Sequence, residues 1–266
     1  MISQLIEFEN QKKETLRGII HAPSAQAEHV VIFIHGFERN ATVEKKFKSL
    51  SDRLAENNIA SFRWDASGCG LSDGEFKKLT IKNRTEEFVE ALAKVASYAK
   101  VSVVVHSLGA CVLDKYLSQK QSKQFVSTIL LAPALNQKEL LRYWFAQSQT
   151  ASDNPAQIVN WKNYREHFNE ILFEKDCARP GRMTKMNYLD SEYFLENNAI
   201  QYGESLQKMK RVMHIHGDAD DKVPLESVPV SFFKKIIIKK GDHDLERPDM
   251  IEQWLESAVD FLALKK

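Results

Sequence analysis

The chain has 266 residues, of which 43% are hydrophobic and 27% are charged, a composition typical of one globular domain with a full core. Its 37 Lys and Arg residues balance 36 Asp and Glu residues, so charge gives no reason to expect a nucleic-acid partner. No apolar run approaches the ~18 residues of a membrane span, and the first residues lack the pattern of a signal peptide. We therefore expect a cytoplasmic protein with no membrane span, and the sequence predicts no particular oligomeric state.

Strand-like and helix-like patterns alternate along the first half of the chain. Two strands at 3–9 and 15–22 are predicted to open the fold, and the helical segment near 82–99 places Phe88, Leu92 and Val95 on one face. This alternation predicts an α/β fold with a mostly parallel, doubly wound sheet of about eight strands and helices on both faces. The further strands are predicted at 29–35, 60–65, 101–106, 125–132, 211–216 and from Ile236, and the further helices near 44–57 and at 108–119.

The alternation stops after residue 135 and resumes near residue 207. A structureless loop longer than ~15 residues is uncommon in a compact domain, so residues 136–206 are predicted to fold as an insertion. Within it, residues 171–174 and 178–183 are predicted to form a hairpin that turns at Pro180 and Gly181. The insertion is rich in aromatic side chains, which suit either the wall of a small-molecule pocket or a small core of the insertion's own: Tyr143, Trp144, Phe145, Trp161, Tyr164, Phe168, Phe173, Tyr188, Tyr193, Phe194 and Tyr202.

A serine, an acidic turn and a histidine each follow a predicted strand. A run of β-branched residues stops at Ser107, the pattern of a nucleophile elbow. Asp220 lies in the turn after the strand at 211–216, together with Asp218 and Asp221, and His243 follows the last strand. This chain order is the one expected of the α/β-hydrolase arrangement. We predict that Ser107 is a nucleophile, that His243 is its base, and that an aspartate of the turn orients the imidazole.

Two backbone N–H groups are candidates to stabilise a developing oxyanion. The Leu108 N–H begins the helix after the elbow, where the helix dipole favours negative charge, and the Phe37 N–H follows a His-Gly turn that ends another strand. Val105 lies two positions before Ser107 and is β-branched. Because strand and helix approach closely at such an elbow, we expect Val105 to crowd it unless the residue that faces it is small.

Five motifs in this order resemble the α/β-hydrolase superfamily: His35–Phe37, Arg63–Gly74, His106–Gly109, Gly217–Asp220 and Asp242–His243. Within that superfamily the chain is most similar to small bacterial serine esterases of the feruloyl/cinnamoyl esterase and monoacylglycerol lipase type, over roughly residues 15–135 and 207–262. The resemblance selects Asp220 as the acid through the pattern Gly-x-x-Asp-x-x-Val-Pro. It implies a hydrolase core at 1–135 and 207–266, and a cap at 136–206 that covers the active site.

The expected function is cleavage of carboxylic esters of small acyl or aryl groups through an acyl-enzyme, with a small-molecule ester as the binding partner. The resemblance implies that cap aromatics line the pocket, and we take Trp144, Trp161 and Phe168 as candidates for substrate contact. A thioesterase, an amidase or a lysophospholipase would use the same three residues. A non-catalytic binding protein on the same fold is a further alternative, which Val105 motivates.

No cofactor and no metal are expected. The alternation His214-x-His216-x-Asp218-x-Asp220 could place ligands on one side of a strand, but the metallo-hydrolase pattern needs a histidine where Ala219 stands. Three cysteines without paired spacing predict neither a disulfide framework nor a zinc site. The loop from Asp65 to Gly74 lacks the dinucleotide fingerprint and is predicted to be structural.

Overall fold

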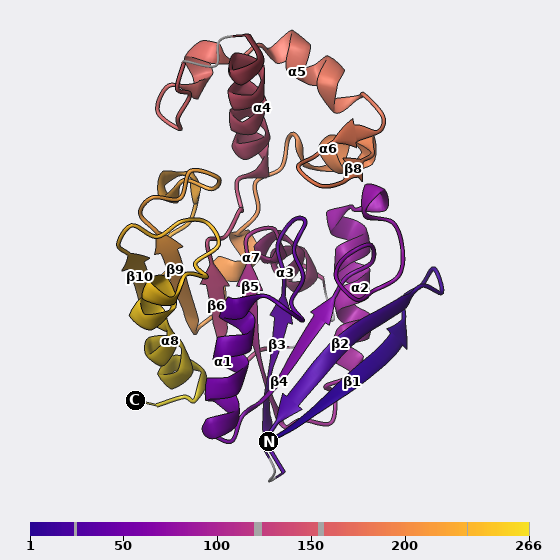
Figure 1. Cartoon of the computed structure of the whole chain (residues 1–266), viewed down its shortest axis with the longest axis vertical. Coiled ribbons are helices and arrows are strands. Elements are labelled where there is room, and N and C mark those ends of the chain that lie inside the picture. Colours follow the sequence, from indigo (N-terminus) through magenta and orange to yellow (C-terminus); the bar gives the residue numbers. More distant parts are fainter. Residues whose placement is uncertain (24–25, 120–123, 154–156, 233, 266) are drawn as a thin grey trace.

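The fold is built on a twisted sheet of eight strands, seen in a computed structural model that describes residues 1–23, 26–119, 124–153, 157–232 and 234–265 (Figure 1). The strand order is β1-β2-β4-β3-β5-β6-β9-β10. β2 is antiparallel to both β1 and β4, and the pairs from β4 to β10 are parallel. The mostly parallel, doubly wound sheet predicted from the sequence is therefore confirmed.

The observed strands agree with the predicted ones except at their ends. The predicted strand at 125–132 is shorter in the structure, because only four of its residues pair with both neighbouring strands. The strands are β1 (Ile2–Glu9), β2 (Thr15–Ala22), β3 (His29–Ile34), β4 (Ala60–Asp65), β5 (Lys100–His106), β6 (Thr128–Leu131), β9 (Val212–Gly217) and β10 (Lys234–Ile238).

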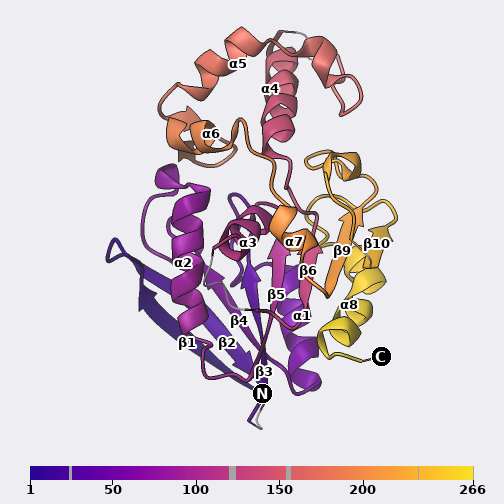
Figure 2. The same cartoon turned by 180° about the vertical axis from the view of Figure 1, so that it is seen from behind.

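Helices cover both faces of the sheet, so the central strands are buried on both sides, as parallel strands usually are. Successive side chains of β3 enter opposite cores: Val31 and Phe33 pack with α1 and α8, whereas Ile32 and Ile34 pack with α2 and α3. Figure 1 shows the first pair of helices in front of the sheet, and Figure 2 shows the second pair from behind. The bounds are α1 (Lys45–Glu56), α2 (Ile81–Ala93), α3 (Gly109–Leu117) and α8 (Pro248–Leu262).

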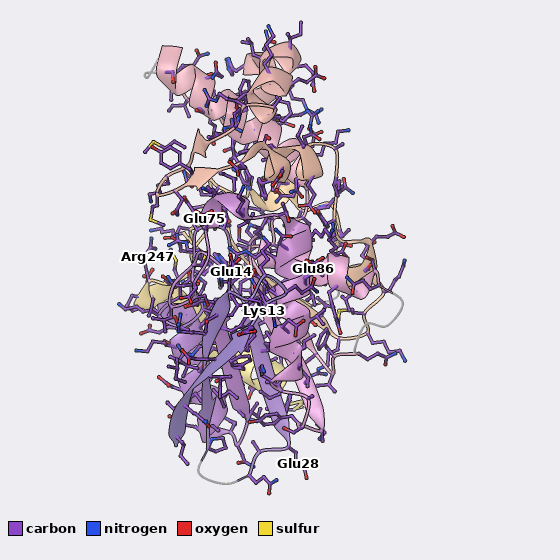
Figure 3. All side chains as sticks on the ribbon, turned by 90° about the vertical axis from the view of Figure 1, so that its right-hand side faces the viewer. Lys13, Glu14, Glu28, Glu75, Glu86 and Arg247 are labelled. Atoms are coloured by element: carbon purple, nitrogen blue, oxygen red, sulfur yellow. The ribbon has the colours of Figure 1, made fainter. Side chains whose placement is uncertain are left out.

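The chain between β6 and β9 forms a layer beyond the ends of the central strands (Figure 1). Figure 3 shows this layer from the side of β1 and β2, with Glu75 just below it and Glu28 at the far end of the sheet. α7 returns to the sheet beside α3, where the Asp114 carboxylate accepts from the N–H groups of Ser205 and Leu206. The elements of this stretch are α4 (Gln137–Asp153), α5 (Glu170–Cys177), β7 (Arg182–Met183), β8 (Tyr188–Leu189), α6 (Ser191–Asn197) and α7 (Glu204–Gln207).

The prediction of a hairpin from residues 171–174 and 178–183 is wrong for its first strand. Residues 170–177 form α5, which begins where the Asn169 side chain accepts from the Leu172 N–H. Asparagine is a favoured N-cap, and this cap outweighs the apolar run that suggested a strand. A hairpin of two short strands, each of two residues, does form. It pairs β7 with β8 and does not involve the residues before Pro180.

A buried carboxylate organises the loop after β4. One oxygen of Asp65 accepts from the Ala41 N–H at 2.7 Å, and the other accepts from the Leu71 N–H at 2.9 Å and from the Thr42 hydroxyl. A Cβ at Gly70 would lie 2.0 Å from this carboxylate. The loop from Asp65 to Gly74 thus packs as a structural element, as predicted. Among the described residues, no helix has the length and apolar character needed to cross a membrane.

A pH-dependent loss of stability is expected at His29, which begins β3 and forms a 2.8 Å hydrogen bond with the Ser102 hydroxyl. Burial, with a smaller contribution from the charge of Lys100, lowers the pKa of His29 to about 4. The unfolded ring takes up a proton near pH 6.5, whereas the folded ring stays neutral. The stability that the neutral ring contributes is therefore present above pH 6.5 and is lost as the pH falls toward 4.

We expect wild-type protein to lose about 1–2 kcal/mol more unfolding free energy than His29→Gln between pH 7 and pH 5. Denaturant titrations at both pH values measure this difference. His167→Gln, a change in the layer above the sheet, is the control and should follow the wild type. Identical pH dependence in His29→Gln and wild type would contradict the assignment.

Candidate active site

The turn between β5 and α3 lifts Ser107 out of the sheet. Ser107 has a φ of +52°, a left-handed conformation that non-glycine residues adopt at a conformational cost. The close approach that this turn requires falls at Gly109, where a Cβ would lie 2.6 Å from the carbonyl oxygen of Ile34. Val105 is fully buried in the same core as residues of α3, and the left-handed turn at Ser107 forms with Val105 in place.

Ser107, His243 and Asp220 are brought together from three separate turns. The Nε2 atom of His243 lies 2.9 Å from the Ser107 hydroxyl oxygen, and its Nδ1 atom lies 2.8 Å from Oδ2 of Asp220. An ionised carboxylate only accepts hydrogen bonds, so Nδ1 carries the proton and Nε2 is left to accept from the serine. The arrangement can remove the hydroxyl proton of Ser107 and keep it on the imidazole.

Asp220 is the buried aspartate of its turn, whereas Asp218 and Asp221 are exposed. Oδ1 of Asp220 accepts from the N–H groups of Lys222 and Val223 at 2.9 and 2.8 Å. Burial alone would raise the pKa of this carboxyl, but its contacts with His216 and His243 lower the pKa well below its usual value. The carboxylate is therefore charged and held in one orientation.

Two histidines that the sequence analysis did not assign support this group. His216 Nε2 donates to the Val223 carbonyl at 2.7 Å and lies 3.2 Å from Oδ2 of Asp220, and its Nδ1 is hydrogen-bonded to His214. His106 Nε2 donates to the backbone carbonyl of His243 at 2.9 Å. Both ring nitrogens of His216 thus take part in hydrogen bonds. This argues against the alternative in which the ring is a metal ligand. Only the alternation of histidines before Gly217 hinted at such a role.

The turn after β3 lies directly beside the elbow. A Cβ at Gly36 would lie 3.1 Å from the Ser107 Cβ, so glycine allows this approach. Among the described residues, neither the Phe37 N–H nor the Leu108 N–H donates a hydrogen bond to another protein atom. Two unused backbone donors next to a serine hydroxyl are what an oxyanion hole requires.

The three aromatic residues expected to contact a substrate differ in their surroundings. Trp144 donates from Nε1 to the Lys222 carbonyl at 2.7 Å, which places it against the turn that carries Asp220. Trp161 packs on Tyr143 and Tyr164. Phe168 packs on two phenylalanines, Phe145 and Phe173. The contacts of Trp161 and Phe168 therefore fit the other possibility, in which these aromatic residues form a small core of the inserted segment itself.

Two other aromatic rings pack on Phe37, the residue that follows Gly36. The Phe37 ring centroid is 5.1 Å from that of Phe76 and 5.7 Å from that of Tyr193 in α6. The Tyr193 hydroxyl donates to Oε1 of Gln137 at 2.9 Å, which fixes this ring between the two layers. The sequence analysis counted Tyr193 among the aromatics but could not distinguish it, because its position depends on how α6 folds back.

Comparison with solved structures finds the same fold along nearly the whole chain. The ferulic-acid complex of Est1E from Butyrivibrio proteoclasticus has a TM-score of 0.73 at 17% identity, and the match covers 97% of this chain and 96% of that one. The esterase domain of a Rhodothermus marinus protein gives 0.67 at 15%, covering 99% of both chains. Mouse α/β hydrolase domain-containing protein 10 gives 0.65 at 16%, covering 99% of this chain and 100% of that one. No curated protein matches the sequence.

The sheet order, the serine elbow and these likenesses define an α/β-hydrolase that is similar to small bacterial esterases. A family model described as serine aminopeptidase, S33, matches residues 25–176, which is more than half of the chain. The chain belongs to this family and is a serine hydrolase by class.

The elbow makes a steric prediction at Gly109. We expect Gly109→Ala to lower the free energy of unfolding by about 1–3 kcal/mol, because the added methyl group must push α3 away from the end of β3. Denaturant unfolding measures the change. Gly181→Ala is the control for the added methyl group without a close contact, since no atom lies within 4 Å there, and its positive φ adds a backbone cost that Gly109 does not have. A loss in Gly109→Ala that is no larger than the loss in Gly181→Ala would contradict the steric role of the contact with Ile34.

Proposed function

We propose that the protein hydrolyses carboxylic esters of small acyl or aryl groups through an acyl-enzyme. Ser107 is the proposed nucleophile, His243 the base, and Asp220 the acid that orients it. The observation that carries this proposal is the continuous pair of hydrogen bonds, 2.9 and 2.8 Å, from serine through histidine to a buried carboxylate. The backbone N–H groups of Phe37 and Leu108 are the proposed oxyanion hole.

The proposed reaction has two halves. Oγ of Ser107 attacks the ester carbonyl carbon while Nε2 of His243 takes the hydroxyl proton, and the carbonyl oxygen becomes an oxyanion facing the two N–H groups. Collapse of this intermediate expels the alcohol, which receives the proton from His243, and leaves an acyl group on Ser107. A water then loses a proton to His243 and attacks the acyl carbon, which releases the acid and restores the serine.

We further propose that residues 136–206 are a cap on a hydrolase core formed by residues 1–135 and 207–266. Its position beyond the ends of the central strands supports this role (Figure 1). Its contacts with the core also support it: Trp144 bonds to the Asp220 turn, and Tyr193 packs on Phe37. Among the residues predicted to contact substrate, Trp144 is the one that we retain, and we add Tyr193, whose ring packs on Phe37. The aromatic surroundings suit an aryl or apolar acyl group.

Amide hydrolysis is the second candidate, because the family model that matches the chain describes an aminopeptidase. Thioesters and lysophospholipids would use the same nucleophile. The three residues alone do not distinguish these substrates, since function depends on the groups around the carbonyl.

A fluorophosphonate probe tests the nucleophile without knowledge of the substrate. We expect intact-mass spectrometry to detect one covalent adduct on wild-type protein, because His243 activates Ser107. Ser107→Ala should form none. Ser72→Ala is a matched control that removes a hydroxyl bonded to the backbone of the Asp65 loop, and it should still react. Folded wild-type protein that forms no adduct would favour the non-catalytic binding protein.

Matched substrates test the bond that is cleaved. We expect the butyrate ester of a chromogenic alcohol to be turned over at least about 100-fold faster, by kcat/KM, than the matching anilide, because an amine leaves less readily than an alcohol. The matching thioester measures the third alternative. A ratio that favours the anilide would replace the esterase proposal with the amidase.

A further inference from the structure

A buried cation lies beneath the proposed oxyanion hole. Arg84, in the first turns of α2, is only 6% exposed. In the described part of the chain, no carboxylate lies within ion-pair distance of its guanidinium. Instead, Nη1 donates to Nε2 of His35 at 3.3 Å and Nη2 donates to the Cys69 sulfur at 3.2 Å. A buried charge without a carboxylate partner is costly, so its position calls for a physical reason.

The contacts of His35 fix which ring nitrogen carries its proton. Nε2 faces two N–H donors, the backbone of Ala66 at 3.1 Å and the guanidinium of Arg84, so Nε2 must accept. Nδ1 therefore carries the proton and donates to the carbonyl of Gly36 at 2.9 Å. Burial first, and then the charge of Arg84, lower the pKa of His35 to about 3, so the ring stays neutral near pH 7.

The Gly36 carbonyl belongs to the same peptide group as the Phe37 N–H. A hydrogen bond to the carbonyl of a peptide draws electrons toward oxygen and makes its N–H a stronger donor, the usual cooperativity of hydrogen-bond chains. Arg84 donates to His35, and His35 donates to the Gly36 carbonyl. The Phe37 N–H, which belongs to the same peptide, is the last donor of this chain. Arg84, Gly36 and Leu108 also line one internal cavity of about 10 Å³, which places the cation near both proposed donors.

We propose that Arg84 is a positioning residue for ester hydrolysis: acting through His35, it holds the Gly36–Phe37 peptide in place and strengthens the Phe37 N–H as an oxyanion donor. This inference rests on the proposed function. If Arg84 only stabilised the fold, its removal would lower the free energy of unfolding and leave kcat/KM unchanged. A residue that acts on the oxyanion lowers kcat when it is removed, because the oxyanion forms only in the transition state.

The test compares three substitutions of one residue on p-nitrophenyl butyrate. Arg84→Met removes the charge and the donors at similar length, Arg84→Gln keeps an N–H donor, and Arg84→Lys keeps the charge. We expect kcat to fall about tenfold in Arg84→Met, and less in Arg84→Lys, with KM within about twofold of wild type. Arg63→Met is the matched control, because Arg63 is equally buried and bonds to the Thr42 carbonyl, away from the serine.

The outcomes separate the two proposals. If wild-type protein shows no turnover, or if its turnover persists in Ser107→Ala, the proposed function is overturned. Turnover in wild type with an unchanged kcat in Arg84→Met overturns the role of Arg84, as does an equal fall of kcat in Arg63→Met.

A measurement on the unmodified protein covers the case in which the variants do not fold. In ¹⁵N NMR spectra of wild-type protein, His35 should be neutral with its proton on Nδ1. A proton on Nε2, or a charged ring at pH 7, would mean that the donor chain does not exist and would overturn the inference without any substitution.

Discussion

The site depends on the close packing of two backbone turns at the ends of β3 and β5. Gly109 lies against the carbonyl of Ile34, and Gly36 lies against the Cβ of Ser107. Because no side chain separates these backbones, the serine and the two unused N–H groups of Phe37 and Leu108 share one small region. The left-handed conformation of Ser107 is held by this packing, since the core beneath it is fully buried.

Buried polar groups then fix the loops that meet at this region. Asp65 gathers the segments at Ala41 and Leu71, and Asp220 gathers the backbone of its own turn together with His243. Each carboxylate uses both oxygens, so neither loop can shift without leaving a buried charge unsatisfied. Two buried histidine rings act in a similar way, because His106 bonds to the His243 backbone and His216 lies against Asp220. The position of Ser107 is thus fixed mostly by polar contacts between the residues around it, and less by contacts of its own.

The sequence predicted the sheet and the meeting of Ser107, Asp220 and His243 because these depend on local patterns: β-branched runs, glycine turns and chain order. It did not predict the supporting histidines, since their roles arise from contacts between distant strands and turns. The close contact at Gly109 was not predicted either, because it depends on where α3 faces β3, which a single strand pattern does not reveal. In the segment from 136 to 206, the Asn169 cap outweighed an apolar run, and the aromatic residues could be counted but not placed.

The residue after Phe37 links the two layers of the molecule. Glu38, at a φ of +51°, accepts with Oε1 from the Met186 N–H at 3.1 Å and from the Asn187 amide at 3.2 Å, and it contacts the Thr184 hydroxyl. The turn between β7 and β8 therefore wraps around a carboxylate whose backbone adjoins an unused N–H. Any displacement of that hairpin exchanges these donors for water. The position of this hairpin and the geometry of the peptide next to the serine are in this way coupled through one side chain.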